Sequence, residues 1–188
     1  PLSGPLSGGT QVHIRFKSLP QTDMLFCMVG GAKTQMQKGS AFEAWCVVPP
    51  STSKGFVEIM VSYNDQEYFT SGVRFEYHPA VHVTRLVPSF GSLKGNTLVR
   101  VVGAGFIQTK SLRCRFGAIP QTVQRFLSST QVECFSPPSA TGPVPVQVAN
   151  NAIDFGSSHT RFDYHEDVEL HSFEPSYGFL SGNTVIRI

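Results

Sequence analysis

An internal repeat limits the possible folds of this chain more than any other feature of its sequence. Pro88-Ser-Phe-Gly-Ser-Leu-Lys-Gly-Asn-Thr97 returns 87 residues later as Pro175-Ser-Tyr-Gly-Phe-Leu-Ser-Gly-Asn-Thr184. Other segments are related by the same interval or by one residue more: Phe75-Glu-Tyr-His78 and Phe162-Asp-Tyr-His165, Cys27 and Cys114, Cys46 and Cys134. Solenoid repeats are shorter, about 20–45 residues, so a period of this length predicts successive separate domains.

The repeat divides the 188 residues into three parts. Residues 80–166 hold a complete repeat, whereas residues 1–79 lack the segment that should form its first strand. Residues 167–188 hold only the opening strands of a third repeat. We therefore expect two domains, the start of another, and a chain that is a segment of a longer protein.

Apolar residues alternate with polar ones within each repeat. Val12, Ile14 and Phe16 are separated by polar residues, and the segments Val57–Val61 and Val144–Val148 show the same period. A period of two is typical of a strand with one buried face, and no window of helical length has a period of 3.6. The sequence thus predicts an all-β fold of tandem immunoglobulin-like β-sandwiches, with about seven strands in each.

Several short motifs of the second repeat together resemble the IPT/TIG family: Pro88-Ser-x-Gly91, Gly95-Asn-Thr97, Val101-Val-Gly-Ala-Gly-Phe106, Cys114-Arg-Phe-Gly117, and Val132-Glu-Cys134 with Pro137-Pro138. Members of this immunoglobulin-like family occur in plexins, growth-factor-receptor ectodomains and fibrocystin-like proteins. The first repeat departs from the pattern, because Phe16-Lys-Ser-Leu19 replaces the glycine-rich bend. The resemblance implies a module for binding or spacing and not an enzyme.

The cysteines are the candidate site residues. Cys27 and Cys46 recur at positions equivalent to Cys114 and Cys134, which favours one disulfide within each repeat. Extracellular members of the family commonly pair these positions, so the resemblance supports the same pairing. Four reduced core cysteines remain the alternative, and no spacing typical of a zinc site is present. Disulfides predict an extracellular or cell-surface location in the secretory pathway.

The other polar residues give no catalytic, cofactor-binding or metal-binding prediction. His78 and His165 occupy equivalent positions after the last strand, so we expect them to serve the fold and to line the domain junction. Asp163-Tyr-His-Glu-Asp167 gathers carboxylates, but its counterpart Glu76-Tyr-His-Pro-Ala80 does not repeat them. A solvated acidic turn is therefore favoured over a calcium site.

Composition limits the kinds of molecule that this chain is expected to bind. A net charge of +2 with scattered basic residues argues against nucleic acid, and no apolar stretch approaches the roughly 18 residues of a membrane span. We expect protein partners, either further repeats of the same chain or neighbouring chains, while carbohydrate stays open as a ligand. The predicted function is a non-catalytic structural or adhesive module of a surface or filament-forming protein. The alternatives are the stalk of a plexin-like or growth-factor-receptor-like ectodomain, and a carbohydrate-binding accessory module of a secreted enzyme.

Overall fold

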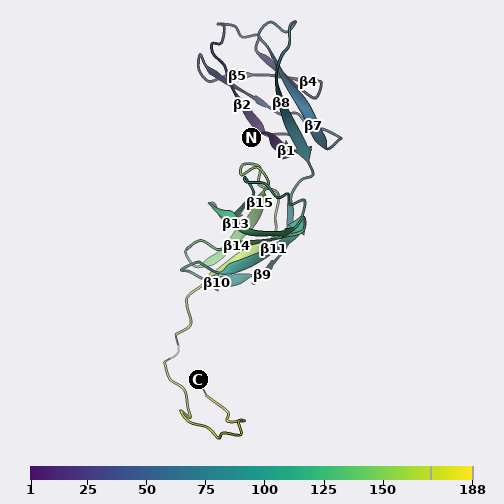
Figure 1. Cartoon of the computed structure of the whole chain (residues 1–188). Coiled ribbons are helices and arrows are strands. Elements are labelled where there is room, and N and C mark those ends of the chain that lie inside the picture. Colours follow the sequence, from purple (N-terminus) through teal and green to yellow (C-terminus); the bar gives the residue numbers. More distant parts are fainter. Residues whose placement is uncertain (170, 188) are drawn as a thin grey trace.

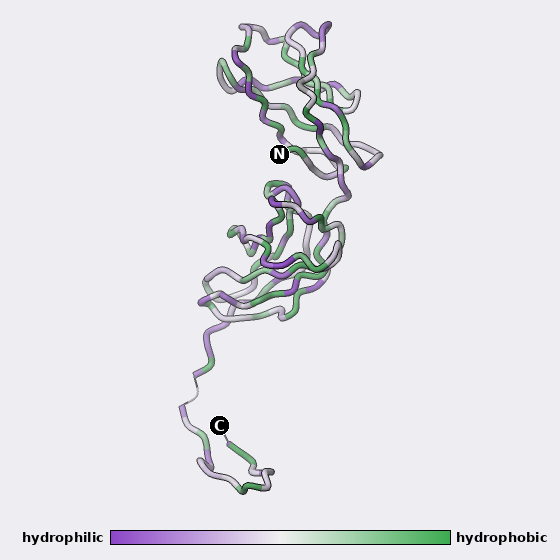
Figure 2. The backbone as a smooth tube through the Cα atoms, in the orientation of Figure 1, coloured by the Kyte–Doolittle hydropathy of each residue, from purple (hydrophilic) through white to green (hydrophobic). Residues whose placement is uncertain are grey.

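A computed structural model describes residues 1–169 and 171–187 of the chain. These residues form β-strands and no helix, arranged as two sandwiches stacked end to end with a tail beyond the second (Figure 1). The predicted all-β, immunoglobulin-like architecture is confirmed. Hydrophobic residues are concentrated in the strands of both sandwiches, and further ones occur in the tail (Figure 2).

The first sandwich contains β1 to β8. Its strands are β1 Ser3–Pro5, β2 Gln11–Arg15, β3 Phe26–Val29, β4 Ala32–Gln35, β5 Gln37–Lys38, β6 Glu43–Val47, β7 Gly55–Ser62 and β8 Phe69–His78. One sheet has the order β1-β8-β7-β3-β4, and the facing sheet has the order β2-β6-β5. Burial alternates along β2, where Val12 is buried between exposed Gln11 and His13, as the period of two predicts.

The second sandwich contains β9 to β16. Its strands are β9 His82–Val87, β10 Phe90–Ser92, β11 Leu98–Ala104, β12 Arg113–Phe116, β13 Ile119–Ser128, β14 Gln131–Phe135, β15 Gly142–Ala149 and β16 Arg161–His165. They are hydrogen-bonded in one continuous order, β10-β16-β15-β12-β13-β14-β11-β9. Strand β13 connects the two layers, because its first half pairs with β12 and its second half with β14.

Equivalent aromatic residues close the two cores. Phe162 and Tyr164 meet edge to face with ring centroids 4.9 Å apart, and Phe75 and Tyr77 do the same at 5.1 Å. A side chain at Gly91 would collide with the hydroxyl of Thr97 and with the Phe162 ring, which explains the glycine of the Pro-Ser-x-Gly motif.

Residues 171–187 repeat the local backbone geometry of the start of the second sandwich. Gly182–Asn183 have positive φ angles of 78° and 66°, close to the 76° and 62° of Gly95–Asn96. The Gly182 amide donates a hydrogen bond to the Phe179 carbonyl at 2.9 Å, just as the Gly95 amide does to Ser92 at 3.0 Å. The turn of the repeat is thus present in the tail.

The tail also keeps the strand register of the repeat. Glu174 and Arg187 form an antiparallel bridge, and the equivalent residues Val87 and Arg100 are paired between β9 and β11. Leu180, in contrast, is fully exposed. These residues have the backbone of an opening hairpin without a core to cover it, and we propose that residues 167–188 open a third sandwich, next to domains at 1–79 and 80–166.

Candidate functional site

The four cysteines lie in the cores of the two sandwiches. Cys27 on β3 is joined to Cys46 on β6, and Cys114 on β12 to Cys134 on β14, each pair with Cα atoms 6.5 Å apart. All four side chains are buried. Each disulfide therefore links the two layers of one sandwich, and no free cysteine occurs among the residues that the structure describes. Such bonds place the segment in an oxidising, extracellular or cell-surface location.

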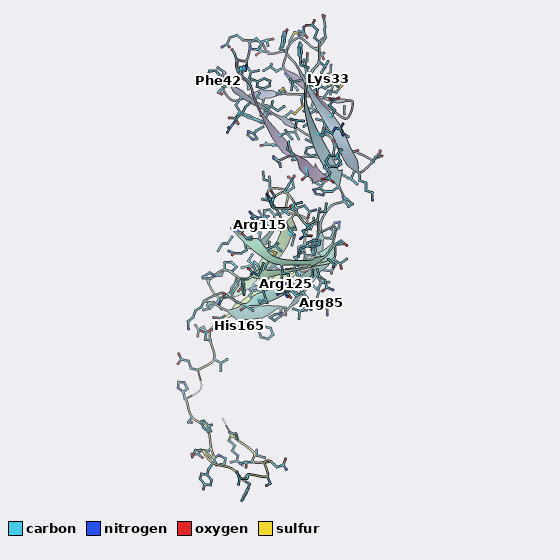
Figure 3. The ribbon with its side chains drawn as sticks, in the orientation of Figure 1. Lys33, Phe42, Arg85, Arg115, Arg125 and His165 are labelled. Atoms are coloured by element: carbon cyan, nitrogen blue, oxygen red, sulfur yellow. A yellow bond between two sulfur atoms is a disulfide. The ribbon has the colours of Figure 1, made fainter. Side chains whose placement is uncertain are left out.

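The two equivalent histidines lie in different surroundings. His78 is buried at the end of β8, directly before the connection to the second sandwich, and its Nδ1 lies 3.0 Å from the Pro79 carbonyl oxygen. His165 is exposed at the end of β16, where the tail leaves the second sandwich (Figure 3). The C-terminal ends of the two domains are alike in sequence, but the histidine is buried only at the end of the first domain.

Two carboxylates of the acidic segment Asp163–Asp167, at the end of β16 and just after it, contact basic side chains. Asp163 lies 3.3 Å from the His165 ring, and Asp167 lies 2.5 Å from the Lys94 ammonium group. The pKa of Asp167 is lowered because Lys94, and then Ser92, donate hydrogen bonds to its carboxylate. These two carboxylates thus face basic side chains of the same sandwich.

Two other kinds of site are absent from residues 1–169 and 171–187. No group of three or more histidine, cysteine, aspartate or glutamate side chains there is arranged to hold a metal ion. The same residues include no helix with the length and apolar character needed to cross a membrane.

A loop after β15 leads to the first sandwich and begins with a buried asparagine. The Asn150 side chain accepts a hydrogen bond from the Ile107 amide at 3.0 Å and donates one to the Gly105 carbonyl at 2.8 Å. The Thr109 hydroxyl donates to the Asn150 backbone carbonyl at 2.7 Å. These bonds fix the loop to the bend after β11, so the next residue projects from a rigid base.

That next residue, Asn151, forms an Asx turn and reaches the first sandwich. Its Oδ1 accepts from the amides of Ile153 and Asp154 at 3.1 and 2.8 Å. Its Nδ2 donates to the Asp154 carboxylate at 2.6 Å and to the backbone carbonyl of Ser3 at 2.7 Å. The Thr10 hydroxyl donates to the same carboxylate oxygen at 2.6 Å. Two side chains of the second sandwich thus bind two groups of the first, and we call these four residues the junction cluster.

Burial shows that the junction cluster is a closed contact. Thr10 is 0% exposed and Asn151 is 6% exposed. The residues equivalent to Thr10 and Gly4 at the far end of the second sandwich, Thr97 and Gly91, are only half-buried. The difference arises because the second sandwich covers the first, whereas the described tail leaves the equivalent surface of the second open.

A mixed polar and apolar cleft of about 580 Å³ lies beside the junction cluster. Residues of both sandwiches line it, among them Phe56, Arg74 and Glu76 from the first and Ser111 and Ile153 from the second. The two domains therefore meet at a hydrogen-bonded corner with this cleft beside it.

Sequence reasoning missed the junction cluster, although a signal for it was present. Asn64, 87 residues before Asn151, also forms an Asx turn, with its Oδ1 accepting from the amides of Gln66 and Glu67 at 3.0 Å each. The Asn64 Nδ2 donates to the Glu67 carboxylate at 3.2 Å. The Asn-x-x-acid pattern is repeated in the sequence, but by itself it indicates only a turn, because asparagine is common in turns of every kind.

Comparisons with known proteins agree with this architecture. The sequence model of the IPT/TIG domain matches residues 1–77 and again residues 82–164. Human Plexin-A2 is 30% identical over 195 residues, which cover 99% of this chain and 10% of that protein. Human Plexin-A4 is 26% identical over 199 residues, which cover 100% of this chain and 10% of that protein. The chain thus spans about a tenth of the length of these relatives.

The fold is also that of a solved plexin. A structure described as the Plexin A4 full extracellular region, domains 1 to 10, matches with a TM-score of 0.54 and 21% identity, over 89% of this chain and 16% of that one. Because the two matched segments correspond to the two sandwiches and span most of the residues, the chain belongs to the IPT/TIG domain family.

Proposed function

We propose that this segment is a non-catalytic spacer in the stalk of a plexin-like ectodomain, in which the junction cluster holds successive sandwiches at a fixed angle. Support comes from the plexin relatives, whose similarity extends over both sandwiches. This proposal selects the receptor-stalk alternative over a free-standing filament or a carbohydrate-binding module. A stalk needs defined geometry more than a ligand pocket, and the junction provides that geometry.

The observation that carries the proposal is the shared carboxylate oxygen of Asp154. It accepts hydrogen bonds at 2.6 Å both from Thr10 of the first sandwich and from Asn151 of its own sandwich. Hydrogen bonds to a charged group typically contribute about 1.5–3 kcal/mol, more than neutral ones. Breaking the junction would leave the Thr10 hydroxyl and the Ser3 carbonyl without these partners. Domains joined by a short connection and small interface move freely by default, so this bonding restricts the motion.

The test uses residual dipolar couplings of the 188-residue chain. One alignment tensor should fit both sandwiches of the unmodified protein, because they behave as one body. In the double variant Asn151→Ala/Asp154→Ala we expect two separate tensors, with the order of one sandwich clearly reduced relative to the other.

The chain itself provides a matched control. Asn64→Ala/Glu67→Ala removes the same Asx turn and the same amide–carboxylate bond from the first sandwich, where they are not part of the junction. This control should retain a single tensor. If the control uncouples the sandwiches as strongly as the junction variant, or if neither does, the junction cluster does not set the angle and the proposal is wrong.

A further inference from the structure

One face of the second sandwich carries several arginine side chains. It is the outer face of β9, β11, β14 and the second half of β13, which pair in that order. Residues opposite one another on these strands form a row across the face: Val87, Arg100, Glu133 and Arg125. Arg85 belongs to the same face, because it pairs with Val102, two positions along β11 from Arg100 (Arg85 and Arg125 are labelled in Figure 3).

The only acidic residue on these strands is Glu133, and two of the arginines nearly cover it. Arg100 donates hydrogen bonds from Nε and Nη2 to Glu133 Oε1 at 3.3 and 3.0 Å, and Arg125 Nη1 lies 3.8 Å from Glu133 Oε2. The Glu133 side chain is 8% exposed, whereas those of Arg100 and Arg125 are 51% and 70% exposed. The carboxylate therefore holds the two guanidinium groups from below, and positive charge faces the solvent.

The charge of this face is part of an imbalance in the whole second sandwich. Residues 80–166 contain eight lysine or arginine residues and four aspartate or glutamate residues, whereas residues 1–79 contain six of each. Of the four acids, Asp154 belongs to the junction cluster and Asp163 contacts His165. The second sandwich thus attracts anionic groups, and the covered Glu133 does little to repel them.

Apolar side chains lie beside the arginines. Leu98 and Phe135 are opposite each other on β11 and β14, and both are exposed. Val87, opposite Arg100 on β9, is exposed as well. Arginine and aromatic residues are enriched in protein–protein interfaces and lysine is depleted, and none of these strands contains a lysine. This mixture is typical of a surface that binds protein.

The fold does not require this arrangement, because the first sandwich has different residues at the equivalent positions. The equivalent of Arg100 is His13. The equivalent of Glu133 is Trp45, whose ring stacks on that of His13 with centroids 5.7 Å apart. Residues that serve the sandwich itself recur in both repeats, as the paired cysteines do. A cluster that is present in only one sandwich points to a contact made by that sandwich.

We propose that this face docks a protein partner whose own surface presents carboxylates beside apolar side chains. A guanidinium has more N–H donors than one carboxylate oxygen accepts, so Arg100 and Arg125 keep donors for the carboxylates of the partner. The apolar side chains of the partner cover Leu98 and Phe135. The proposal uses no residue of the junction cluster and does not depend on the spacer role. We call the surface the arginine face, made of Arg85, Val87, Leu98, Arg100, Arg125 and Phe135.

Synthetic peptides added to the 188-residue chain test the arginine face through its amide NMR signals. The probe Glu-Leu-Glu-Gly-Phe-Glu combines carboxylates with apolar side chains, and it should shift signals of β9, β11, β13 and β14 but not those of the first sandwich. Replacing its glutamates by lysines should abolish the shifts. Replacing its leucine and phenylalanine by serines should weaken binding at least about threefold. Added salt should also weaken binding, because exposed charges are screened.

Two matched variants of the chain locate the binding. Arg85→Gln/Arg125→Gln should lower the affinity for the acidic apolar probe at least about threefold, since exposed ion pairs are individually weak but two are lost. The control Lys110→Gln/Arg161→Gln removes two positive charges from exposed positions elsewhere on the second sandwich and should keep nearly the full affinity. Thermal unfolding of each variant checks that it is folded.

Glu133→Gln gives a test of opposite sign. It keeps an acceptor for Arg100 but removes the negative charge, so the acidic apolar probe should bind about twofold more tightly. Weaker binding to this variant, equal losses in the two double variants, or no shifts on the arginine face would overturn the proposal. A heparin fragment that binds the face where the peptide does not would overturn it in favour of a sulfated glycan.

Discussion

Two equivalent tyrosines hold the ends of the sandwiches through their hydroxyl groups. Tyr164 donates a hydrogen bond to the Pro137 carbonyl at 2.8 Å, and Tyr77 donates to Pro49 at 2.6 Å. The variant Tyr164→Phe keeps the ring packing but leaves a carbonyl without its partner. We expect a loss of about 1–3 kcal/mol in the free energy of unfolding of the second sandwich. Calorimetry should place its transition several degrees lower and leave that of the first unchanged, with Tyr77→Phe as the reciprocal control.

The same tyrosine predicts a pH dependence. Burial raises the pKa of Tyr164 above its ordinary value, partly opposed by a hydrogen bond with Ser136, because the charged phenolate is poorly solvated in the core. The folded state therefore favours the neutral phenol. The resulting gain in the free energy of unfolding is complete below the unfolded pKa of about 10. It disappears as the pH rises through the higher folded pKa. Denaturation curves between neutral and strongly alkaline pH should show a smaller decline for Tyr164→Phe than for the unmodified chain, and an equal decline would contradict the assignment.

The disulfide pairing stays a prediction for the native protein. Replacing Cys114 and Cys134 together by alanine should lower the free energy of unfolding of the second sandwich by about 3 kcal/mol, the chain-entropy value for a loop of this length. Peptide mapping without reduction should find Cys27 linked to Cys46 and Cys114 to Cys134. A bridge between the two repeats, or free thiols throughout, would contradict both the pairing and the extracellular location.

At the scale of elements, the sequence pattern predicted strands better than it predicted their partners. Alternation along β2 identified which side chains point inward, because burial of one face determines that period. It could not show that β10 pairs in parallel with the last strand β16, since hydrogen bonds between strands depend on the backbone and not on side-chain type. The path of the long β13 was likewise not predictable, because β13 changes partner from β12 to β14 after Thr122 and its pairing with β14 contains two register shifts.

Strand β9 gives a prediction about domain independence. Residues 80–166 include all the strands β9 to β16 and their own core, so we expect this piece to fold alone with one cooperative transition. Starting at Pro88 removes β9 and with it buried Val83 and Leu86. That shorter piece should lose at least about 3 kcal/mol, estimated from the burial of two such side chains. Noncooperative unfolding of the longer piece under oxidising conditions would show that the boundary is wrong.

At the scale of the whole molecule, the repeat predicted separate domains but not the joint between them. The residues of the junction cluster are Ser3, Thr10, Asn151 and Asp154, and none of them is unusual in a turn or strand. Their role arises only when two sandwiches are stacked, so it depends on the path of the short connection from β8 to β9. The structure reveals the role of these residues, because the covered end of the first sandwich differs in burial from the open, equivalent end of the second.

The equivalence of the two ends predicts that a further sandwich can dock on the second one as the second docks on the first. The open end of the second sandwich presents Thr97 where the first presents Thr10, in the same turn geometry. A chain of residues 1–167 followed by a second copy of residues 81–166 would place another Asn151–Asp154 turn against this end. We expect both joints to have the same angle, because both would use the same hydroxyl, carbonyl, amide and carboxylate groups.

Small-angle scattering and residual dipolar couplings of this three-domain chain would measure the two angles. Thr10→Val should increase motion at the first joint only, and Thr97→Val at the second only, since each removes one hydroxyl donor without changing side-chain shape. Thr97→Val in the 188-residue chain is the control and should change nothing, because no sandwich covers that end. Different angles at the two joints, or a second joint that ignores Thr97→Val, would show that the open end is not an equivalent docking surface.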